Sequence, residues 1–200
     1  RGLVTGSLER DILESRELKE ISDLCFNCHQ CQMECPATVN IPKLVLEAKA
    51  QHVASHGLTL RERLINRLDL LSAMGSRFSR IANWALGNSS MRWLLERSFG
   101  IAQGRKLPKL ARKSFINWST REKLNRSDRS SCRKVLFFVD QYANWHNPIL
   151  GRALVEVLRH HKISVYVPTT QTPSYMAMIS AGEIQRARKL ISANIKVLAD

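Results

Sequence analysis

The chain is predicted to have a mixed fold, in which an α-helical domain around a cysteine loop is followed by a helical connector and a partial α/β domain. Four of its five cysteines lie within eleven residues, between two segments of helical pattern. From residue 135, short apolar runs alternate with amphipathic segments, which is typical of parallel strands and crossover helices. We expect a cysteine-containing helical domain at 1–57, amphipathic helices at 58–104, a basic linker at 105–134 and the first part of an α/β domain at 135–200.

Composition and cysteine spacing indicate the class of the protein and its cellular compartment. Of its 200 residues, 44% are hydrophobic and 24% charged, as in ordinary globular domains. Clustered cysteines favour a metal site in a reducing compartment over a disulfide framework, which would spread them along the chain. No apolar stretch reaches the roughly 18 residues of a membrane span, and no signal-peptide pattern is present, so a cytoplasmic location is expected. The chain begins with Arg1 rather than Met, which suggests a piece of a longer polypeptide.

The first domain is expected to be helix, loop, helix. Residues 8–24 carry apolar side chains at roughly helical spacing. Pro42 and Gly57 bracket a second helix, which fits the preference for proline at the start of a helix and glycine after its end. The loop at 25–40 between the two helices carries the cysteines.

The loop contains the pattern C-x2-C-x2-C-x3-C-P, formed by Cys25, Cys28, Cys31, Cys35 and Pro36. This compact run is the bacterial ferredoxin pattern, in which thiolates hold a [4Fe–4S] cluster. The first three cysteines are expected to share one cluster. Cys35 either completes that cluster or, as in two-cluster ferredoxins, ligates another one. Structural zinc is the weaker alternative, because zinc sites usually separate two cysteine pairs by about a dozen or more residues.

Two further residues of ligand type, His29 and Cys132, are not expected to bind metal. His29 lies inside the loop and is expected to face solvent or to donate to cluster sulfur rather than to ligate iron. Cys132 stands alone in the basic linker and is expected to be a free thiol without function.

The middle of the chain is helical and then strongly basic. The helical pattern of 58–104 is broken near Gly75, Gly87 and Gly100, with apolar stripes opposite arginine-rich faces. Packing on the rest of the fold is the favoured interpretation, and docking on a membrane or a flavoprotein is the alternative. The net charge is +14, and residues 105–134 hold eleven Lys and Arg against two acids. A solvated linker is favoured, with phosphate or anionic-lipid contact as the alternative. Specific nucleic-acid binding is not expected, because no recognition motif accompanies the charge.

The last part of the chain is expected to fold as β-α-β-α, with strands at 135–139 and 163–167 and helices from Pro148 to about His161 and at 182–199. A right-handed crossover of this kind places both strands in a parallel sheet. Polar residues follow the first strand, at the edge where open α/β sheets bind ligands; they are Asp140, Tyr142, Asn144, His146 and Asn147. A polar turn is the favoured interpretation, and a small-molecule or interface role is the alternative.

Residues 25–43, CFNCHQCQMECPATVNIPK, resemble the second [4Fe–4S] motif in the iron–sulfur portion of FAD-linked oxidases. These proteins are relatives of the iron–sulfur subunits of anaerobic glycerol-3-phosphate dehydrogenase, glycolate oxidase and heterodisulfide reductase. The basic helical region and residues 134–148, KVLFFVDQYANWHNP, are also similar to this family, so the resemblance covers nearly the whole chain. It implies a ferredoxin-like cluster domain followed by a cysteine-rich domain that a strand opens.

The chain departs from this family in two places. The family usually carries an earlier cysteine quartet, which these residues lack; if upstream sequence supplies it, Cys35 would belong to that upstream cluster. The family's Cys-Cys-Gly signature is replaced by Pro173, Ser174 and Tyr175. None of these three is a good iron–sulfur ligand, so no cluster is expected at these positions.

The resemblance implies an electron-transfer module of a flavin-linked oxidoreductase, with the catalytic FAD on an upstream domain or partner and no catalytic residue in this chain. The substrate would be a 2-hydroxy acid or glycerol 3-phosphate, and the acceptor a quinone at the membrane. The alternative is a non-enzymatic scaffold with a structural metal site and a basic surface that docks on an anionic membrane or a partner. Attachment to the cytoplasmic face of the inner membrane is compatible with both.

Overall fold

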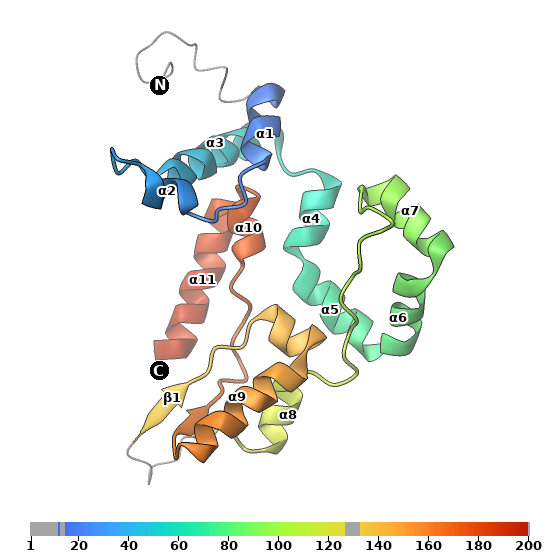
Figure 1. The fold of residues 1–200 in the computed structure, drawn as a ribbon, viewed down its shortest axis with the longest axis vertical. Helices are drawn as coiled ribbons and strands as arrows, with labels where there is room; N and C mark the ends of the chain where they lie inside the picture. Colours follow the sequence, from blue (N-terminus) through green and yellow to red (C-terminus); the bar gives the residue numbers. More distant parts are fainter. Residues whose placement is uncertain (1–11, 13–14, 127–132, 200) are drawn as a thin grey trace. The chain divides into compact units, whose positions relative to one another are not determined.

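The computed structural model describes residue 12 and residues 15–126 and 133–199. It is mostly helical, at 63%, with a two-stranded parallel sheet (Figure 1), so the expected mixture of helices and parallel strands is confirmed at this coarse level. The chain divides into two compact units, each made from two stretches of sequence. Unit 1 comprises residues 1–66 and 175–192, and unit 2 comprises residues 67–174 and 193–200. This division differs from the boundaries expected from the sequence, because residues 175–192 group with the cysteine loop.

Unit 1 is helical. It contains α1 (Arg16–Asp23), α2 (Gln30–Glu34), α3 (Ile41–His56), α4 (Leu60–Asn66), α10 (Met176–Ser180) and the first part of α11 (Ile184–Ala199). Both α1 and α2 pack against α3, and α10 packs against α4. The helix predicted at 8–24 is found as α1, and its earlier part, apart from Ile12, lies outside the described residues.

Local signals fix the helix ends of unit 1. The Ser15 hydroxyl accepts from the N–H of Leu18 at 3.2 Å and begins α1. The Asn40 side chain accepts from the N–H of Lys43 at 3.0 Å and begins α3, with proline in the first turn. Gly57 ends α3 with a φ of 75°, in the left-handed region that favours glycine. The predicted helix between Pro42 and Gly57 is therefore confirmed.

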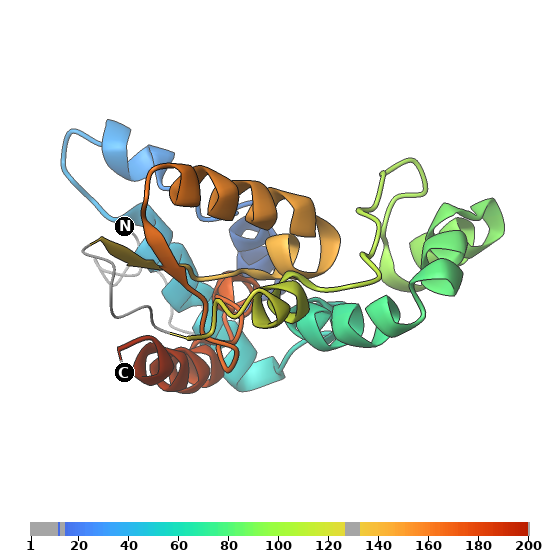
Figure 2. The same cartoon turned by 90° about the horizontal axis from the view of Figure 1, so that it is seen from below.

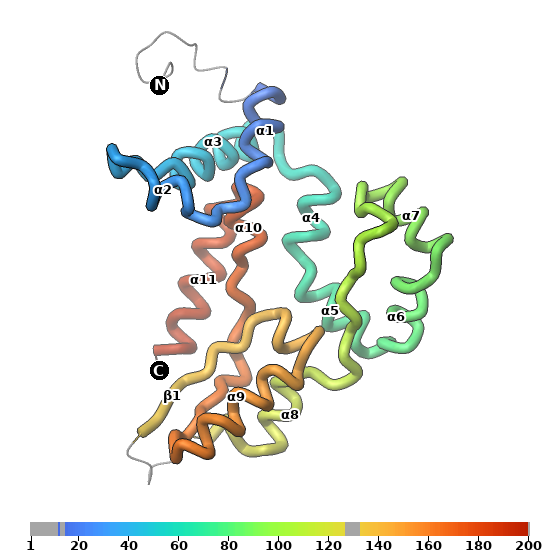
Figure 3. Tube along the Cα trace, in the orientation of Figure 1, coloured from blue at the N-terminus to red at the C-terminus, as the bar shows by residue number. Residues whose placement is uncertain are grey.

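Unit 2 combines helices with the sheet. Its elements are α5 (Leu68–Arg77), α6 (Ser79–Gly87), α7 (Ser89–Phe99), α8 (Phe115–Arg121), β1 (Lys134–Leu136), the π-helical turn η2 (Tyr142–His146), α9 (Pro148–His160) and β2 (Ser164–Tyr166). The strands pair in parallel, with Val135 opposite Val165. Figure 2 shows α9 lying alongside β2, and Figure 3 traces the crossover from β1 through α9. The predicted parallel β-α-β crossover is confirmed, although both strands are shorter than expected.

The core of unit 2 draws on the segment expected to be a linker. Its buried side chains are Phe115, Leu124, Val139, Val155, Val165 and Val167. Phe115 belongs to α8 and is 0% exposed. The expectation of a solvated linker at 105–134 therefore fails for residues 115–124. Apolar residues among the cations form part of a helix, α8. The high density of charge in this segment led to the prediction of a linker instead.

Two further expectations are corrected. Val135 and Leu136 were expected in a buried strand, but both are exposed, because only one strand pairs with β1 among the described residues. The expected break near Gly75 lies instead at Phe78, between α5 and α6. Gly75 is inside α5, where a Cβ atom would come within 2.6 Å of a Leu110 side-chain carbon. Glycine at position 75 allows α5 to pack closely against Leu110, and it does not end the helix.

Candidate functional site

The cysteine loop joins α1 to α3 and contains α2. Cys25 follows the end of α1, and its backbone N–H donates to the Ser22 carbonyl at 3.0 Å. Cys28 lies in the loop, Cys31 in α2, and Cys35 directly after α2. Cys28 and Cys31 are exposed, Cys25 and Cys35 are half-buried, and none of the four forms a disulfide. The segment therefore offers four free thiols on one surface loop.

Between Cys25 and Cys31, the loop backbone is unusual at two residues. Asn27 and His29 have φ angles of 61° and 62°, in a region that costs residues other than glycine about 1–3 kcal/mol. The side-chain oxygen of Asn27 is buried without a hydrogen-bond partner. The Nδ1 atom of His29 lies 3.0 Å from Oε1 of Gln32, so the ring is engaged with α2. Strained backbone and an unpaired buried oxygen occur together between the first and second cysteines.

The donor set fits a [4Fe–4S] cluster, because four free thiols stand at the ferredoxin spacing. Across residues 15–126 and 133–199, no three His, Cys, Asp or Glu side chains gather closely enough to hold a metal ion. No three of the four sulfurs therefore lie close enough to share a metal ion in this structure. Ligation would require the loop from Cys25 to Cys35 to draw them together.

A buried lysine of α3 reaches the first cysteine. Lys49 is 4% exposed, and its Nζ donates to the carbonyl oxygens of Cys25 at 3.0 Å and of Ser180 at 3.1 Å. A carboxylate oxygen of Asp23 lies 3.7 Å from the same ammonium. A buried charge is tolerated only with such partners, so Lys49 joins α3 to the loop and to the end of α10. Sequence reasoning missed Lys49, whose one signal was a lysine between Ala48 and Ala50 at the centre of a helix.

A charged pair holds α1, the helix that leads into Cys25. The Nζ of Lys19 lies 2.8 Å from a carboxylate oxygen of Glu62 in α4 and 2.5 Å from one of Asp23. Burial alone would lower the pKa of Lys19, but the hydrogen bonds with Asp23 and Glu62 outweigh it and raise that pKa. Burial alone would raise the pKa of Glu62, but the hydrogen bonds from Lys19 and Thr59 outweigh it and lower that pKa. Both side chains are therefore charged at neutral pH.

Polar side chains of the loop after β1 make hydrogen bonds and a ring contact within unit 2. The Asp140 carboxylate accepts from the backbone N–H of Ser174 at 3.2 Å and from its hydroxyl at 3.0 Å. The Asn144 side chain accepts from a backbone N–H of α8 at 3.1 Å. The ring of Tyr142 stacks on that of His146 at 5.9 Å. These contacts favour the interpretation of this loop, which ends at Asn147, as a structural turn.

A cavity of about 140 Å³ nevertheless lies at this edge, beside Asn144, Gln171 and Thr172. Gln171 is buried; its side chain accepts from the N–H of Val139 and donates to the carbonyl of Pro168, both at 2.7 Å. The Thr172 hydroxyl is buried without a partner. Most polar groups around this cavity hold the two post-strand loops together, which leaves few to recognise a ligand.

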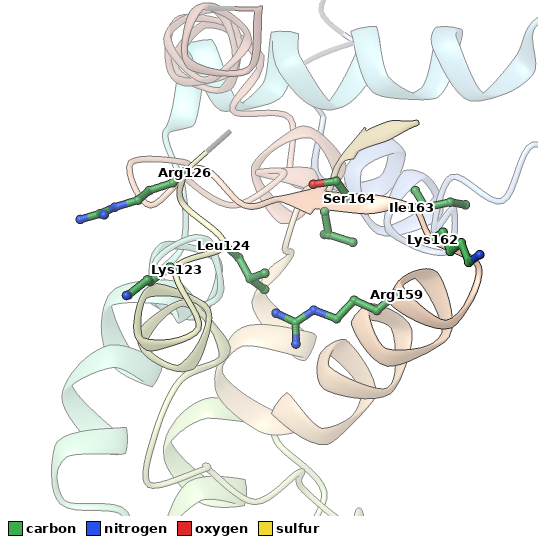
Figure 4. Close-up of a pocket in the computed structure, with 8 residues that line it drawn as sticks. Lys123, Leu124, Arg126, Arg159, Lys162, Ile163 and Ser164 are labelled. Atoms are coloured by element: carbon green, nitrogen blue, oxygen red, sulfur yellow. The ribbon is translucent and has the colours of Figure 1, made fainter. Parts of the chain in front are cut away.

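A basic hollow of about 370 Å³ lies between the end of α8 and the end of α9. Lys123, Arg126, Arg159 and Lys162 line it, and all four are exposed. Figure 4 shows the charged ends of Arg126 and Lys162 pointing to opposite sides, and Arg159 pairs with Glu122 at 3.6 Å. Because these cations do not converge, the hollow agrees with the expected solvated surface.

The remaining candidates add no further site. His160 and His161 lie at the C-terminal end of α9, as expected, with their ring centroids 5.4 Å apart. Cys132 lies outside the described residues. Of the helices that the structure describes, none is both long and apolar enough to cross a membrane.

No model of a known protein family matches the chain, and no solved structure matches it.

Proposed function

We propose that the chain is an iron–sulfur electron-transfer module, in which Cys25, Cys28, Cys31 and Cys35 bind a [4Fe–4S] cluster. The observation that carries this proposal is the set of four free thiols at the ferredoxin spacing on one surface loop. When bound, the cluster would accept and release single electrons. The chain supplies the ligands, the helices that anchor both ends of the loop and the charge of Lys49. Cys35 either completes this cluster or ligates a second one.

The electron donor we propose is a reduced flavin on another domain or protein, whose substrate is a 2-hydroxy acid or glycerol 3-phosphate. Support comes from Leu24, Phe26 and Met33, large apolar side chains beside the cysteines that are 79–82% exposed. Exposed apolar patches often mark sites of protein contact. A partner that covered these side chains would bring its cofactor to the cysteine loop.

We also infer that the segment after β2 derives from a cysteine-rich domain that has lost its ligands. Tyr175 stands where the family signature has glycine, and its φ of 55° lies in the left-handed region that favours glycine. Ser174 stands at a cysteine position and donates to Asp140 instead. Both features support a signature backbone whose metal-binding side chains have been replaced.

Anaerobic reconstitution with ferrous iron and sulfide tests the cluster. We expect bound iron and sulfide, and an EPR signal after reduction with dithionite. Cys25→Ser should lose the signal and most of the iron, whereas Cys132→Ser, which removes the cysteine outside the motif, should keep both. Stoichiometric zinc, or a wild-type chain that binds no iron, would refute the proposal.

A second candidate function is docking on an anionic membrane surface. Phe78, Ile81 and Trp84, around and within α6, are 63–66% exposed. Arg77 and Arg80 line a hollow of about 270 Å³ together with Phe78 and Ile81. Aromatic and aliphatic side chains beside arginines are typical of surfaces that lie in the headgroup region of a bilayer. Such contact would place the module near a quinone-linked acceptor.

Vesicle sedimentation tests this surface. We expect binding to vesicles with anionic lipid that weakens as salt is added, because exposed charges are screened. Trp84→Ser should weaken this binding, whereas Ile149→Ser, at an exposed apolar position on α9, should not. Equal binding to neutral and anionic vesicles, or none to either, would leave the +14 charge as a solvated surface.

A further inference from the structure

Lys49 is the only buried lysine among the residues that the structure describes. Its ammonium contacts two backbone carbonyls that lie far apart in the sequence, those of Cys25 and Ser180. The first belongs to the residue that opens the cysteine motif, and the second ends α10. One side chain therefore connects the loop with a helix more than a hundred residues later.

A glycine in the turn after α10 lies against the backbone of the same residue, Lys49. Gly182, in the turn between α10 and α11, has a φ of 87°. A Cβ atom there would lie 2.7 Å from the backbone carbon of Lys49 and 2.8 Å from its carbonyl oxygen. The turn thus rests directly on the backbone of α3, and this approach requires glycine for both its conformation and its lack of a side chain.

The positive charge of Lys49 would also affect the balance between the oxidised and reduced states of a cluster. Reduction of a cluster adds one electron and forms or breaks no bond, so the change is one unit of negative charge. A buried cation is screened less than an exposed one. Asp23, whose carboxylate lies 3.7 Å from the Lys49 ammonium, is about half exposed, so it offsets this charge only in part. A cation at this place would favour the reduced state of a cluster bound by the loop.

We propose that Lys49 is a positioning residue for the cluster loop: it fixes the carbonyl of Cys25 to the end of α10, and its charge raises the reduction potential of a cluster bound there. The inference rests on the proposed function for its redox part. Its structural part concerns the iron-free chain and stands on the contacts of Lys49 and Gly182 alone.

Hydrogen–deuterium exchange on the full, iron-free chain tests the positioning role. Lys49→Met should speed exchange severalfold at residues 25–29 and 176–182, because both carbonyls lose their shared donor. Gly182→Ala should do the same while retaining the lysine, because its Cβ pushes the turn away from α3. Lys189→Met removes the same charge at an exposed position of α11 and should leave both segments unchanged. Wild-type exchange rates at 25–29 in Lys49→Met and Gly182→Ala would overturn the positioning role.

The reduction potential of the reconstituted protein tests the role of the charge. Lys49→Met should shift the potential to a more negative value, whereas Lys189→Met should not. If Lys49→Met does not retain a cluster, Lys49→Gln keeps a donor for the Cys25 carbonyl without the charge, and the same negative shift is expected. A wild-type potential in these neutral variants would overturn the electrostatic part of the proposal.

The two proposals fail in different ways. If the wild-type chain binds no iron, electron transfer is refuted, and the exchange experiment still decides whether Lys49 holds the loop. If iron binds and the exchange rates of Lys49→Met match those of the wild type, the cluster stands and the role of Lys49 is refuted.

Discussion

Gly151 shows how one residue sets the distance between two helices of unit 2. A Cβ atom on Gly151 in α9 would lie 2.6 Å and 2.7 Å from ring carbons of Phe115. Phe115 is fully buried and packs in the core of unit 2, where there is little room for its ring to shift. Alanine normally stabilises a helix by about 1 kcal/mol relative to glycine, but overpacking costs about 1–3 kcal/mol. We expect Gly151→Ala to lower the free energy of unfolding by up to about 2 kcal/mol, measured by urea denaturation.

Gly87→Ala is the matched control for this experiment. Gly87 also lies in a helix, α6, and nothing is within 4 Å of the position its Cβ would occupy. This variant should be neutral or slightly stabilising, because only the helix propensity changes. A Gly151→Ala variant as stable as Gly87→Ala would mean that Phe115 and α9 are not in close contact.

At the scale of elements, the start of α4 combines a helix cap with an ion pair. The N–H of Thr59 donates to the Glu62 carboxylate at 2.8 Å, and the N–H of Glu62 donates to the Thr59 hydroxyl at 3.3 Å. This reciprocal pair is a capping box. The same carboxylate holds Lys19 of α1, so Glu62 both begins α4 and fastens the helix that leads to the cysteines.

The pH dependence of this pair follows from the two pKa shifts. The pKa of Glu62 is lowered from 4.5, so its stabilisation is present above that pH and is lost as the pH falls through the folded-state value. The pKa of Lys19 is raised from 10.5, so its stabilisation is present below that pH and is lost at higher pH. We expect Glu62→Gln to cost about 1–3 kcal/mol at pH 7, where a charged hydrogen bond is removed. The difference from the wild type should shrink well below pH 4.5, as urea denaturation at both pH values would measure.

Glu20→Gln provides the comparison for Glu62→Gln. Glu20 pairs with Arg16 on the surface of α1, where both side chains are at least 66% exposed. Such pairs contribute little, so this variant should change stability only slightly at either pH. A loss in Glu62→Gln that stayed the same in acid would show that capping geometry, rather than charge, is what the carboxylate provides.

Local signals explain which elements the sequence could predict. Pro42, Gly57 and Pro148 marked helix ends correctly, because capping and proline geometry act within a few residues. The contact of Lys49 with Ser180 joins residues 131 apart, and no periodic pattern encodes such a pair. α8 was missed for a related reason: its burial depends on Val155 and Val165, which come later in the chain. The cysteine ligands remain a prediction from spacing alone.

At the scale of the whole molecule, segments that are distant in the sequence belong to the same compact unit. Residues 175–192 follow the sheet in sequence but belong to the compact unit of the cysteine loop. Met178, in α10, is 3% exposed, and α10 packs on α4. Residues 175–192 therefore contribute to the packing of the unit that contains the cysteine loop, through α4 and Lys49.

A pair of core substitutions tests this division of the molecule. Met178→Ala should cost about 2–5 kcal/mol, as expected for a buried methionine, and hydrogen–deuterium exchange should rise in α3 and α4. Val155→Ala removes a fully buried side chain from the other core and should cost about 1–3 kcal/mol, with exchange rising in α8 and β2. Two distinct patterns are expected because the two residues belong to different compact units. If Met178→Ala instead loosened the sheet and left α3 and α4 protected, α10 would belong with the α/β domain, as the order of the sequence first suggested.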